Sequence, residues 1–256
     1  ILNIINHQSL IATKAARVVY AARGDGIMEF GLRRAQGPDA GIYGARAAVI
    51  GGCIGTSNVL TGKMFDVPVK GTHAHSWIMS FPDEYTAFKT YAELYPHACI
   101  LLVDTYDVLD SGVPNAIRVF KEMKEKDPEF KNYGIRIDSG DLAYLSKEAY
   151  KMLDAAGFGD AVISASSDLD EYLIDSLKAQ GAKINSWGVG TNLITSKDCP
   201  AFGGVYKLAA IKDREDAEFI PKIKLSENSE KVTNPGNKTI FRIYDKATGK
   251  IRADLI

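Results

Sequence analysis

The feature that most constrains the fold is a unit that recurs between Gly26 and about Thr191. In each unit a short apolar run ends in a polar cluster that contains glycine, and an amphipathic stretch follows. The apolar runs are GIMEF (26–30), DVPVK (66–70), ACILLV (98–103), GIRI (134–137), AVIS (161–164) and SWGVG (186–190). Nearly continuous apolar runs of this length are typical of strands buried on both faces of a parallel sheet.

Helices are predicted between these strands, over residues 39–52, 82–96, 114–127, 141–157 and 168–181. Strands and helices that alternate at roughly 25–35 residues per unit predict a parallel β/α architecture. No GxGxxG follows the first strand, and polar clusters follow every strand instead of meeting at one switch point. We therefore expect a TIM-like parallel β/α barrel, complete or incomplete, with its chemistry at the carboxyl ends of the strands.

The sequence changes character after about Lys212, where the helical period disappears. KTIFRIYD (238–245) and KIRADLI (250–256) alternate in polarity and are joined by KATG, which predicts a β-hairpin. Because a lone hairpin is marginally stable, we expect it to belong to a second, β-rich domain that is incomplete here. The expected division is a barrel domain over 1–212 and a β-rich segment over 213–256. The abrupt ends of the chain also suggest cuts within a longer protein.

The composition argues against several classes of function. The chain has 31 Lys and Arg against 32 Asp and Glu, so no basic field favours nucleic acid or an anionic membrane. No apolar run approaches the ~20 residues that span a bilayer, and no signal peptide is visible. Cys53, Cys99 and Cys199 are widely spaced without a CxxC pair. They predict reduced thiols in a cytoplasmic protein.

Reactive side chains follow six predicted strands. They lie in the motifs EFGLRR (29–34), GTHAHS (71–76), DTYD (104–107), IDSGD (137–141), SASSD (164–168) and GVGTN (188–192). In a barrel these strand ends would share one rim. The last two motifs offer backbone amides and hydroxyls that suit a phosphate dianion. Tight turns that bind nothing are the alternative for either motif alone.

Arg136 and Asp138 are two residues apart and point to the same side of a strand. The planar guanidinium of Arg136 suits a carboxylate or an aromatic ring, and Asp138 can accept hydrogen bonds from two vicinal hydroxyls. A simple ion pair between them is the alternative. Phe30 is either a core residue or a ring that stacks on an aromatic substrate, and of Arg33 and Arg34 we expect one to be a surface residue.

The histidines His73 and His75 raise the question of a metal site. Zinc requires three or four ligands, and His7 and His97 lack ligand spacing, so zinc is not predicted. A histidine that a carboxylate orients is a good base or nucleophile. Asp104 ends the next strand in sequence, so we expect a His75–Asp104 pair and a structural role for His73.

The motifs EFGLRR, GTHAHSW, LLVDTYD, IRIDSGD, SWGVGT and GGVYKL occur in this order and spacing in nicotinate phosphoribosyltransferase. Over residues 1–256 the chain resembles that family. The resemblance implies transfer of a phosphoribosyl group from PRPP to nicotinate, with Mg²⁺, in NAD salvage. It further implies coupling to ATP hydrolysis through a phosphohistidine, and a homodimer with active sites at its interface.

The resemblance also implies roles for individual residues. His75 is the phosphorylated histidine and Asp104 the carboxylate that orients it, while Asp138 accepts the ribose hydroxyls. Arg136 pairs with the pyridine carboxylate. The remaining substrate-binding residues would be the stacking ring Phe30, the phosphate or pyrophosphate contact Arg33, the neutral Ser57, and a 5′-phosphate cradle of Ser166, Ser167, Gly188, Gly190 and Thr191. An aspartate stands at the place of Ser57 in the nicotinamide-using relative, and a neutral serine tolerates the acid better.

Three other interpretations stay open. The chain could be a non-catalytic fragment that retains only the pocket or the dimer surface, because the segments expected before and after it are absent. It could belong to a nicotinamide-using relative. A phosphate-binding lyase or aldolase is a weaker alternative, since no lysine at these strand ends could form a Schiff base.

Overall fold

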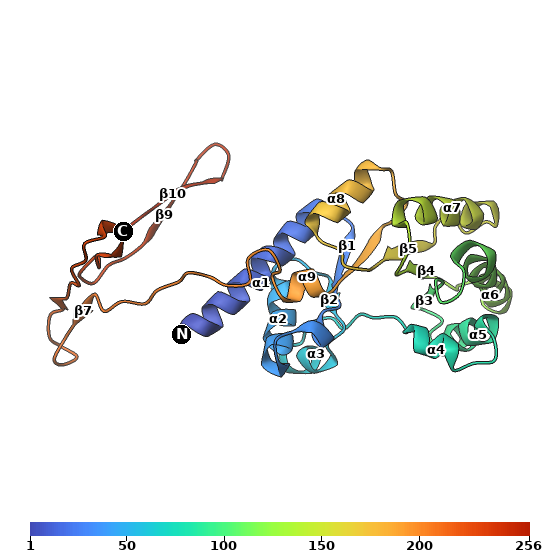
Figure 1. The fold of residues 1–256 in the computed structure, drawn as a ribbon, viewed down its shortest axis with the longest axis horizontal. Helices are drawn as coiled ribbons and strands as arrows, with labels where there is room; N and C mark the ends of the chain where they lie inside the picture. The colour runs from blue at the N-terminus through green and yellow to red at the C-terminus, as the bar shows by residue number, and fades with distance from the viewer. The chain divides into compact units, whose positions relative to one another are not determined.

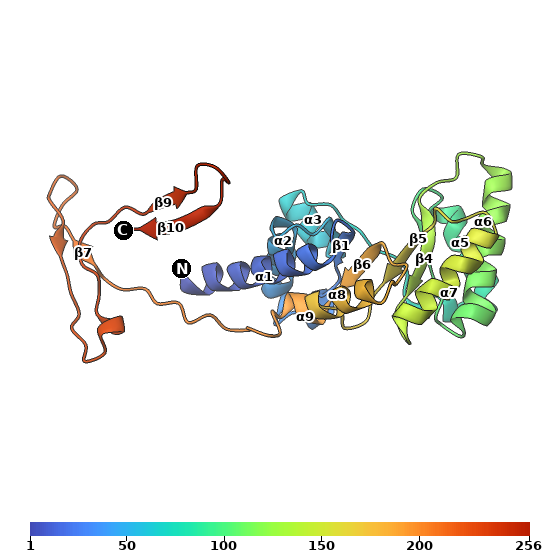
Figure 2. The same ribbon diagram turned by 90° about the horizontal axis from the view of Figure 1, so that it is seen from above.

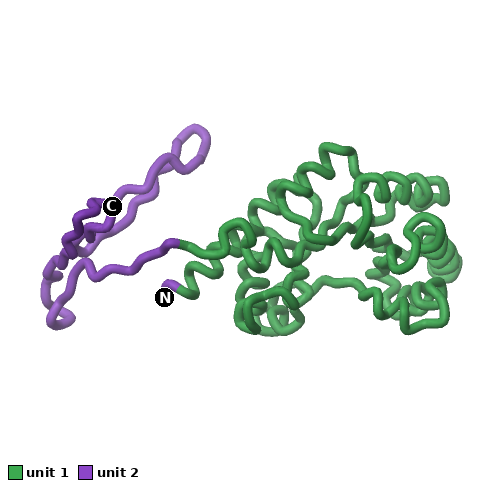
Figure 3. Tube along the Cα trace, viewed as in Figure 1, with its two compact units in different colours: residues 1, 3–202 green, residues 2, 203–256 purple.

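The computed structural model describes residues 1–256 and divides them into two compact units (Figure 3). Residues 1 and 3–202 form the first unit, and residues 2 and 203–256 form the second. The division falls between Phe202 and Gly203, before the boundary expected after residue 212. Residues 203–209 have no helix or strand and are largely exposed, so the segment that follows Phe202 does not extend the β/α pattern.

The first unit is built on a curled parallel sheet of six strands (Figures 1 and 2). Its strands are β1 (Gly26–Glu29), β2 (Gly55–Thr56), β3 (Cys99–Leu102), β4 (Tyr133–Ile137), β5 (Val162–Ala165) and β6 (Ser186–Val189). They follow the order β2-β1-β6-β5-β4-β3, which is the cyclic order of a barrel opened between β2 and β3. The expected β/α architecture is confirmed as a half-barrel, but the closed barrel is not formed.

The strand expected over residues 66–70 is wrong. This segment contributes only an isolated parallel bridge, between Val69 and Thr56, and the second strand of the sheet is β2. Asp66 has a left-handed backbone (φ 53°), and Pro68 has no amide hydrogen to donate. The apolar pattern could not reveal either restriction on a ladder of hydrogen bonds.

Helices surround the sheet and include every helix that the sequence predicts. They are α1 (Leu2–Ala21), α2 (Pro38–Ile50), α3 (Val59–Phe65), α4 (His75–Met79), α5 (Glu84–Leu94), α6 (Val113–Lys126), α7 (Leu142–Ala155), α8 (Glu171–Ala179) and α9 (Thr191–Ile194). Asp83, Asp141 and Asp170 accept amide hydrogen bonds at the starts of α5, α7 and α8. Asp168, the expected start of α8, has a left-handed backbone (φ 43°) instead.

The core lies between the sheet and the helices on its outer face. Helices α5, α6 and α7 pack beside β3, β4 and β5 (Figures 1 and 2). The largest side chains in this core are almost completely buried: Trp187, Phe88, Phe120 and Phe130. Burial of both faces explains why these strands are continuous apolar runs. This core holds the strand ends that carry the candidate site.

The second unit contains two small antiparallel sheets. Strands β7 (Ala210–Ile211) and β8 (Ile220–Pro221) form one, and β9 (Phe241–Tyr244) and β10 (Ile251–Leu255) form the other. The predicted hairpin is thereby confirmed, with an irregular register between Ile251 and Ala253. Every residue of β9 and β10 is exposed. None of the helices has both the length and the apolar character needed to cross a bilayer.

Candidate active site

Polar side chains gather where the six strands of the half-barrel end. Two cavities lie at this rim, one of about 220 Å³ and one of about 380 Å³. They share the lining residues Phe30, Arg33, Arg136 and Asp138, so one ligand can extend from the first cavity into the second. The parallel strands bring these residues together because their carboxyl ends meet at one edge of the sheet.

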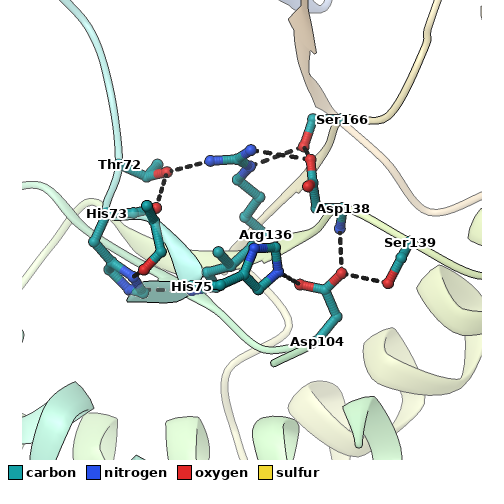
Figure 4. A network of polar contacts seen from close by, with 10 residues as sticks. Thr72, His73, His75, Asp104, Arg136, Asp138, Ser139 and Ser166 are labelled. Atoms are coloured by element: carbon teal, nitrogen blue, oxygen red, sulfur yellow. Dashed lines mark hydrogen bonds and ion pairs between the residues drawn. The ribbon is translucent and has the colours of Figure 1, made fainter. Parts of the chain in front are cut away.

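His75 and Asp104 are in contact at one side of this rim (Figure 4). Nε2 of His75 lies 3.1 Å from Oδ1 of Asp104. The Asp104 side chain is 2% exposed, whereas that of His75 is 40% exposed. The other carboxylate oxygen of Asp104 accepts from the Asp138 amide at 3.1 Å and from the Ser139 hydroxyl at 2.6 Å. A buried carboxylate with these fixed partners orients the imidazole and leaves its Nδ1 side free to react.

Arg136 is held on three sides of its guanidinium group (Figure 4). Nε donates to the Ser166 hydroxyl at 2.8 Å, Nη1 to the Thr72 hydroxyl at 2.8 Å, and Nη2 to Asp138 at 3.0 Å. Ser166 also donates to the same Asp138 oxygen. Of the five N–H donors of an arginine, two therefore stay available for a ligand in a fixed orientation.

The Phe30 ring lies against β6 and beside Arg136. The guanidinium carbon of Arg136 is 5.5 Å from the centre of the ring. A Cβ atom added at Gly188 would approach the ring to 2.5 Å, so only glycine leaves room for Phe30 in this position. Phe30 lines both cavities and is half-buried. The ring is thus an aromatic platform at the rim and does not belong to the core.

The smaller cavity is rich in groups that suit an anion. Its lining includes Arg33, Arg34, Ser166, Ser167, Asp168, Gly188, Gly190 and Thr191. Ser167 and Asp168 have left-handed backbones, with φ of 96° and 43°. Strain of this kind at residues other than glycine is typical of ligand clamps. All five residues expected in the phosphate cradle are therefore brought to one cavity.

Ser57 lines the larger cavity with His75 and Arg136. It follows β2, and its amide donates to the Glu29 carbonyl at 3.0 Å. The Glu29 side chain is completely buried beneath the rim and accepts from the Thr56 hydroxyl at 2.6 Å and from the Gly31 amide. Burial raises the pKa of Glu29. This carboxyl group ties the ends of β1 and β2 together below Phe30.

His73 lines the larger cavity, but its ring packs against the core residues Phe88 and Tyr91. It is 7% exposed, and burial lowers its pKa to about 4. The ring is therefore neutral near pH 7. Its place in the structure agrees with the structural role expected for it, although its ring borders the larger cavity.

Three polar residues at the rim were not singled out from the sequence. Arg34 lines the smaller cavity together with Arg33, and both arginines are exposed, so the one expected at the surface also reaches the site. The pair lies in a short 3₁₀ turn (Leu32–Arg34), so the alternation of a strand does not apply. Thr72 and Ser139 belong to motifs already noted, but their partners Arg136 and Asp104 are remote in sequence.

The rim contains no cluster of three or more His, Cys, Asp or Glu side chains that could hold a metal by themselves. Asp138 and Asp168 do line the smaller cavity beside the arginines. Mg²⁺ usually binds through one or two carboxylates together with substrate phosphates. The donor set therefore fits a Mg²⁺ ion that arrives with a phosphorylated ligand.

Comparisons with known proteins identify the family of this chain. The profile of the nicotinate phosphoribosyltransferase (NAPRTase) family matches residues 26–246. The chain is 56% identical over 256 residues to nicotinate phosphoribosyltransferase of Bacillus subtilis (strain 168), covering all of this chain and 51% of that protein. It is 40% identical over 290 residues to the enzyme of that name from Dictyostelium discoideum, covering 95% of this chain and 48% of that protein.

A solved structure shows the same similarity. The crystal structure of human nicotinic acid phosphoribosyltransferase matches with a TM-score of 0.78 at 31% identity, over 97% of this chain and 55% of that one. The chain thus spans about half the length of the relatives it matches. Because the family profile matches residues 26–246 and a relative is 56% identical over all of this chain, the chain belongs to the nicotinate phosphoribosyltransferase family.

Proposed function

We propose that this protein transfers the phosphoribosyl group of PRPP to nicotinate, giving nicotinate mononucleotide and pyrophosphate in NAD salvage. The observation that carries the proposal is the Arg136 guanidinium, held beside the Phe30 ring and facing a cavity that continues into the Ser166–Asp168 loop. An aromatic acid needs an aromatic ring beside a guanidinium group, and a phosphate group needs a loop of hydroxyls and amides. The pocket offers the first at one end and the second at the other. Family membership supports the same assignment.

The pyridine ring would bind between the two cavities. Its face would stack on Phe30, and its carboxylate would accept from the two free N–H groups of Arg136, since paired donors match a carboxylate. Ser57 on the same wall is neutral, so the acid is not repelled there. We infer nicotinate as the substrate on these grounds.

The phosphoribosyl group would occupy the smaller cavity. Oδ1 of Asp138 is taken by Arg136 and Ser166, which leaves Oδ2 to accept from the ribose hydroxyls. The 5′-phosphate would lie against Ser166, Ser167 and the Gly188–Thr191 turn. Bound in this way, the anomeric carbon faces the pyridine nitrogen, and positioning supplies much of the rate enhancement.

The leaving group is a pyrophosphate, and its developing charge must be stabilised. Arg33 and Arg34 on the cavity wall are the cationic side chains in reach. Mg²⁺, when bound, would add positive charge at the same place, and Asp168 would hold it. The C–O bond to pyrophosphate breaks as the bond from the pyridine nitrogen to the anomeric carbon forms.

ATP coupling would proceed at His75. Because Asp104 engages Nε2, Nδ1 would take the γ-phosphoryl group of ATP, with ADP as the leaving group. Water would later cleave the P–N bond. A phosphoryl group adds about −1.5 to −2 charges, by analogy with phosphorylated hydroxyl side chains, and would alter the affinity of the nearby PRPP site. A homodimer in the cytoplasm, with the active site at its interface, is the assembly we propose from the family resemblance.

The test combines nicotinate, PRPP, Mg²⁺ and ATP with the protein and measures nicotinate mononucleotide by chromatography. Formation of the product at a rate that depends on nicotinate supports the proposal. Turnover of nicotinamide in place of nicotinate would assign the protein to the amide-using relative instead. A chain that binds the mononucleotide in calorimetry but makes none would be a non-catalytic fragment, a reading prompted by its half-length match to the relatives.

A further inference from the structure

The open side of the half-barrel is crossed by residues 67–74, here called the strap. On the β2 side the strap makes backbone hydrogen bonds: the Thr56 amide donates to Pro68, and the Lys70 amide donates to Thr56. On the β3 side it makes no backbone hydrogen bond. Side chains must therefore connect the strap to β3 if the rim is to be closed there.

His73 makes this connection through an amide of β3 that faces the opening. The amides of Cys99 and Val103 donate towards β4, at Asn132 and Arg136, so the alternate amide of Leu102 points to the other side. It donates to Nε2 of His73 at 3.2 Å. The imidazole thus takes the place that a neighbouring strand would have on this edge of the sheet.

The surroundings of His73 keep the ring in the form that accepts this bond. The ring packs edge-on against Tyr91, with 4.6 Å between the ring centres, and beside Phe88. Nδ1 lies 3.5 Å from the carbonyl oxygen of Ala74, which favours the tautomer with its proton on Nδ1. The lowered pKa of His73 agrees with a neutral ring.

The two histidines of GTHAHS contact β3 and the segment directly after it in one register. His73 meets Leu102 and His75 meets Asp104, and the two partners are 29 residues apart in both pairs. A constant offset is what a parallel ladder produces between neighbouring strands. A slip of one residue would shift the strap by about 3.3 Å along β3 and separate His75 from the only buried carboxylate that it contacts.

We propose that His73 is a positioning residue that closes the half-barrel against β3 and sets the register in which His75 meets Asp104. His73 contacts no substrate in this scheme and acts through the strap alone. The consequence for catalysis rests on the proposed role of His75, whereas the register itself is a structural property that can be measured without any substrate.

The experiment compares His73→Phe, which keeps an aromatic ring but no acceptor, with His73→Gln, which keeps an acceptor oxygen. Ser80→Ala is the matched control, because it removes one hydrogen bond (2.7 Å, to Trp77) at the exposed residue that follows α4. Two NMR readings are taken on ¹⁵N-labelled protein. The first is the scalar coupling across the Leu102 N–H···Nε2 bond in the unmodified chain. The second is the NMR signal of the Hε2 proton of His75. This proton exchanges slowly with water, and its signal is therefore visible, only while it is hydrogen-bonded to Asp104.

We expect the coupling in the unmodified chain, loss of the His75 proton signal in His73→Phe, and retention of that signal in His73→Gln and Ser80→Ala. A folded His73→Phe protein with the signal unchanged overturns the proposal, as does absence of the Leu102 coupling. If His73→Phe does not fold, the proposal is tested by the Leu102 coupling in the unmodified chain and by the spectrum of His73→Gln. Loss of the His75 proton signal in His73→Gln also overturns the proposal.

Labelling with [γ-³²P]ATP then tests the consequence. Acid-labile phosphate on His75 should fall about tenfold or more in His73→Phe, since small misplacements of reacting groups have effects of that size. Labelling of His73→Phe at the level of the Ser80→Ala control would contradict the positioning role. If no variant and no unmodified protein is labelled, the proposed ATP coupling fails, while the NMR readings still decide the register.

Discussion

Replacing His73 should remove an acid-sensitive component of the stability of this fold. His73 is 7% exposed and faces Tyr91, His75 and Arg136, and burial lowers its pKa to about 4. In the unfolded chain a histidine titrates near pH 6.5. Because the folded pKa is the lower one, the unfolded chain binds the extra proton first as the pH falls. Stability from the neutral ring is therefore complete above about pH 6.5 and declines between about pH 6.5 and pH 4.

The size of the effect follows from the two pKa values. Proton linkage between 6.5 and about 4 gives a loss of about 2 kcal/mol at pH 5 and about 3 kcal/mol at pH 4, relative to neutral pH. Other titrating groups contribute equally to the unmodified chain and to a variant that lacks only this imidazole. The difference in unfolding free energy between the two proteins isolates the contribution of His73.

Urea unfolding at pH 7, 6 and 5, followed by tryptophan fluorescence, measures that difference for His73→Gln and His73→Phe. We expect the unmodified chain to lose about 2 kcal/mol more than either variant between pH 7 and pH 5. The unfolding free energies of the two variants should change with pH in the same way. They should differ by a constant amount, because only glutamine keeps an acceptor for the Leu102 amide. A pH-independent difference between the unmodified chain and His73→Gln would refute the account of a buried neutral ring.

Three further substitutions probe the site and its support. Gly188→Ala places a Cβ 2.5 Å from the Phe30 ring, so we expect a loss of about 1–3 kcal/mol in urea unfolding and weaker calorimetric binding of nicotinate mononucleotide. Unchanged binding would mean that the ring is not the platform. Glu29 accepts hydrogen bonds from the Gly31 amide and the Thr56 hydroxyl. In Glu29→Gln one of these two donors would face the NH₂ group of the glutamine and lose its acceptor, so the unfolding free energy should fall by about 1–3 kcal/mol. Lys14→Met removes one of the two ion pairs of the buried Glu171, at 2.7 Å, and leaves the second, to Arg17 at 2.8 Å, so it should lower the unfolding free energy by about 1–3 kcal/mol. A double variant with Glu171→Leu should recover part of that loss, and a failure to recover any of it would contradict the lost charge partner of Glu171 as its cause.

Much of the β/α pattern was predictable because its signals are local. The helices expected over 82–96, 114–127 and 141–157 correspond to α5, α6 and α7. Their amphipathic period and their capping residues lie within a few positions of the helix ends, where the hydrogen bonds form. The hairpin of β9 and β10 was visible for the same reason, because its two strands adjoin one turn.

The edges of the sheet were not predictable in this way. The apolar pattern placed a strand at 66–70, whereas the structure has the two-residue β2 and a strap whose one β-bridge to the sheet joins Val69 and Thr56. A segment becomes a strand only when a neighbouring strand accepts and donates its backbone hydrogen bonds. At the edge of a sheet, the arrangement of the whole sheet decides which segment takes that position. The same holds for closure, since whether β2 and β3 pair is decided by the curl of the sheet between them.

Within the site, the sequence predicted the types of residue, whereas the structure was needed to show which of them are in contact. Spacing predicted that Arg136 and Asp138 share a side, and that His75 has a carboxylate within reach. It did not predict that Thr72 fixes Arg136, or that Arg34 joins Arg33 at the anion cavity.

The sequence by itself determined the five predicted helices and five of the six predicted strands in the repeating part of the chain, and it determined which family the chain resembles. Tertiary structure alone decided that the half-barrel stays open, that a histidine side chain bridges the opening, and that the two histidines contact β3 and the segment directly after it in one register. The physical reason is the distance along the sequence between the residues that form each hydrogen bond. Hydrogen bonds within a helix or a hairpin join near neighbours, whereas the rim bonds of His75 with Asp104, Arg136 with Thr72, and Ser166 with Asp138 join residues 28 to 64 positions apart.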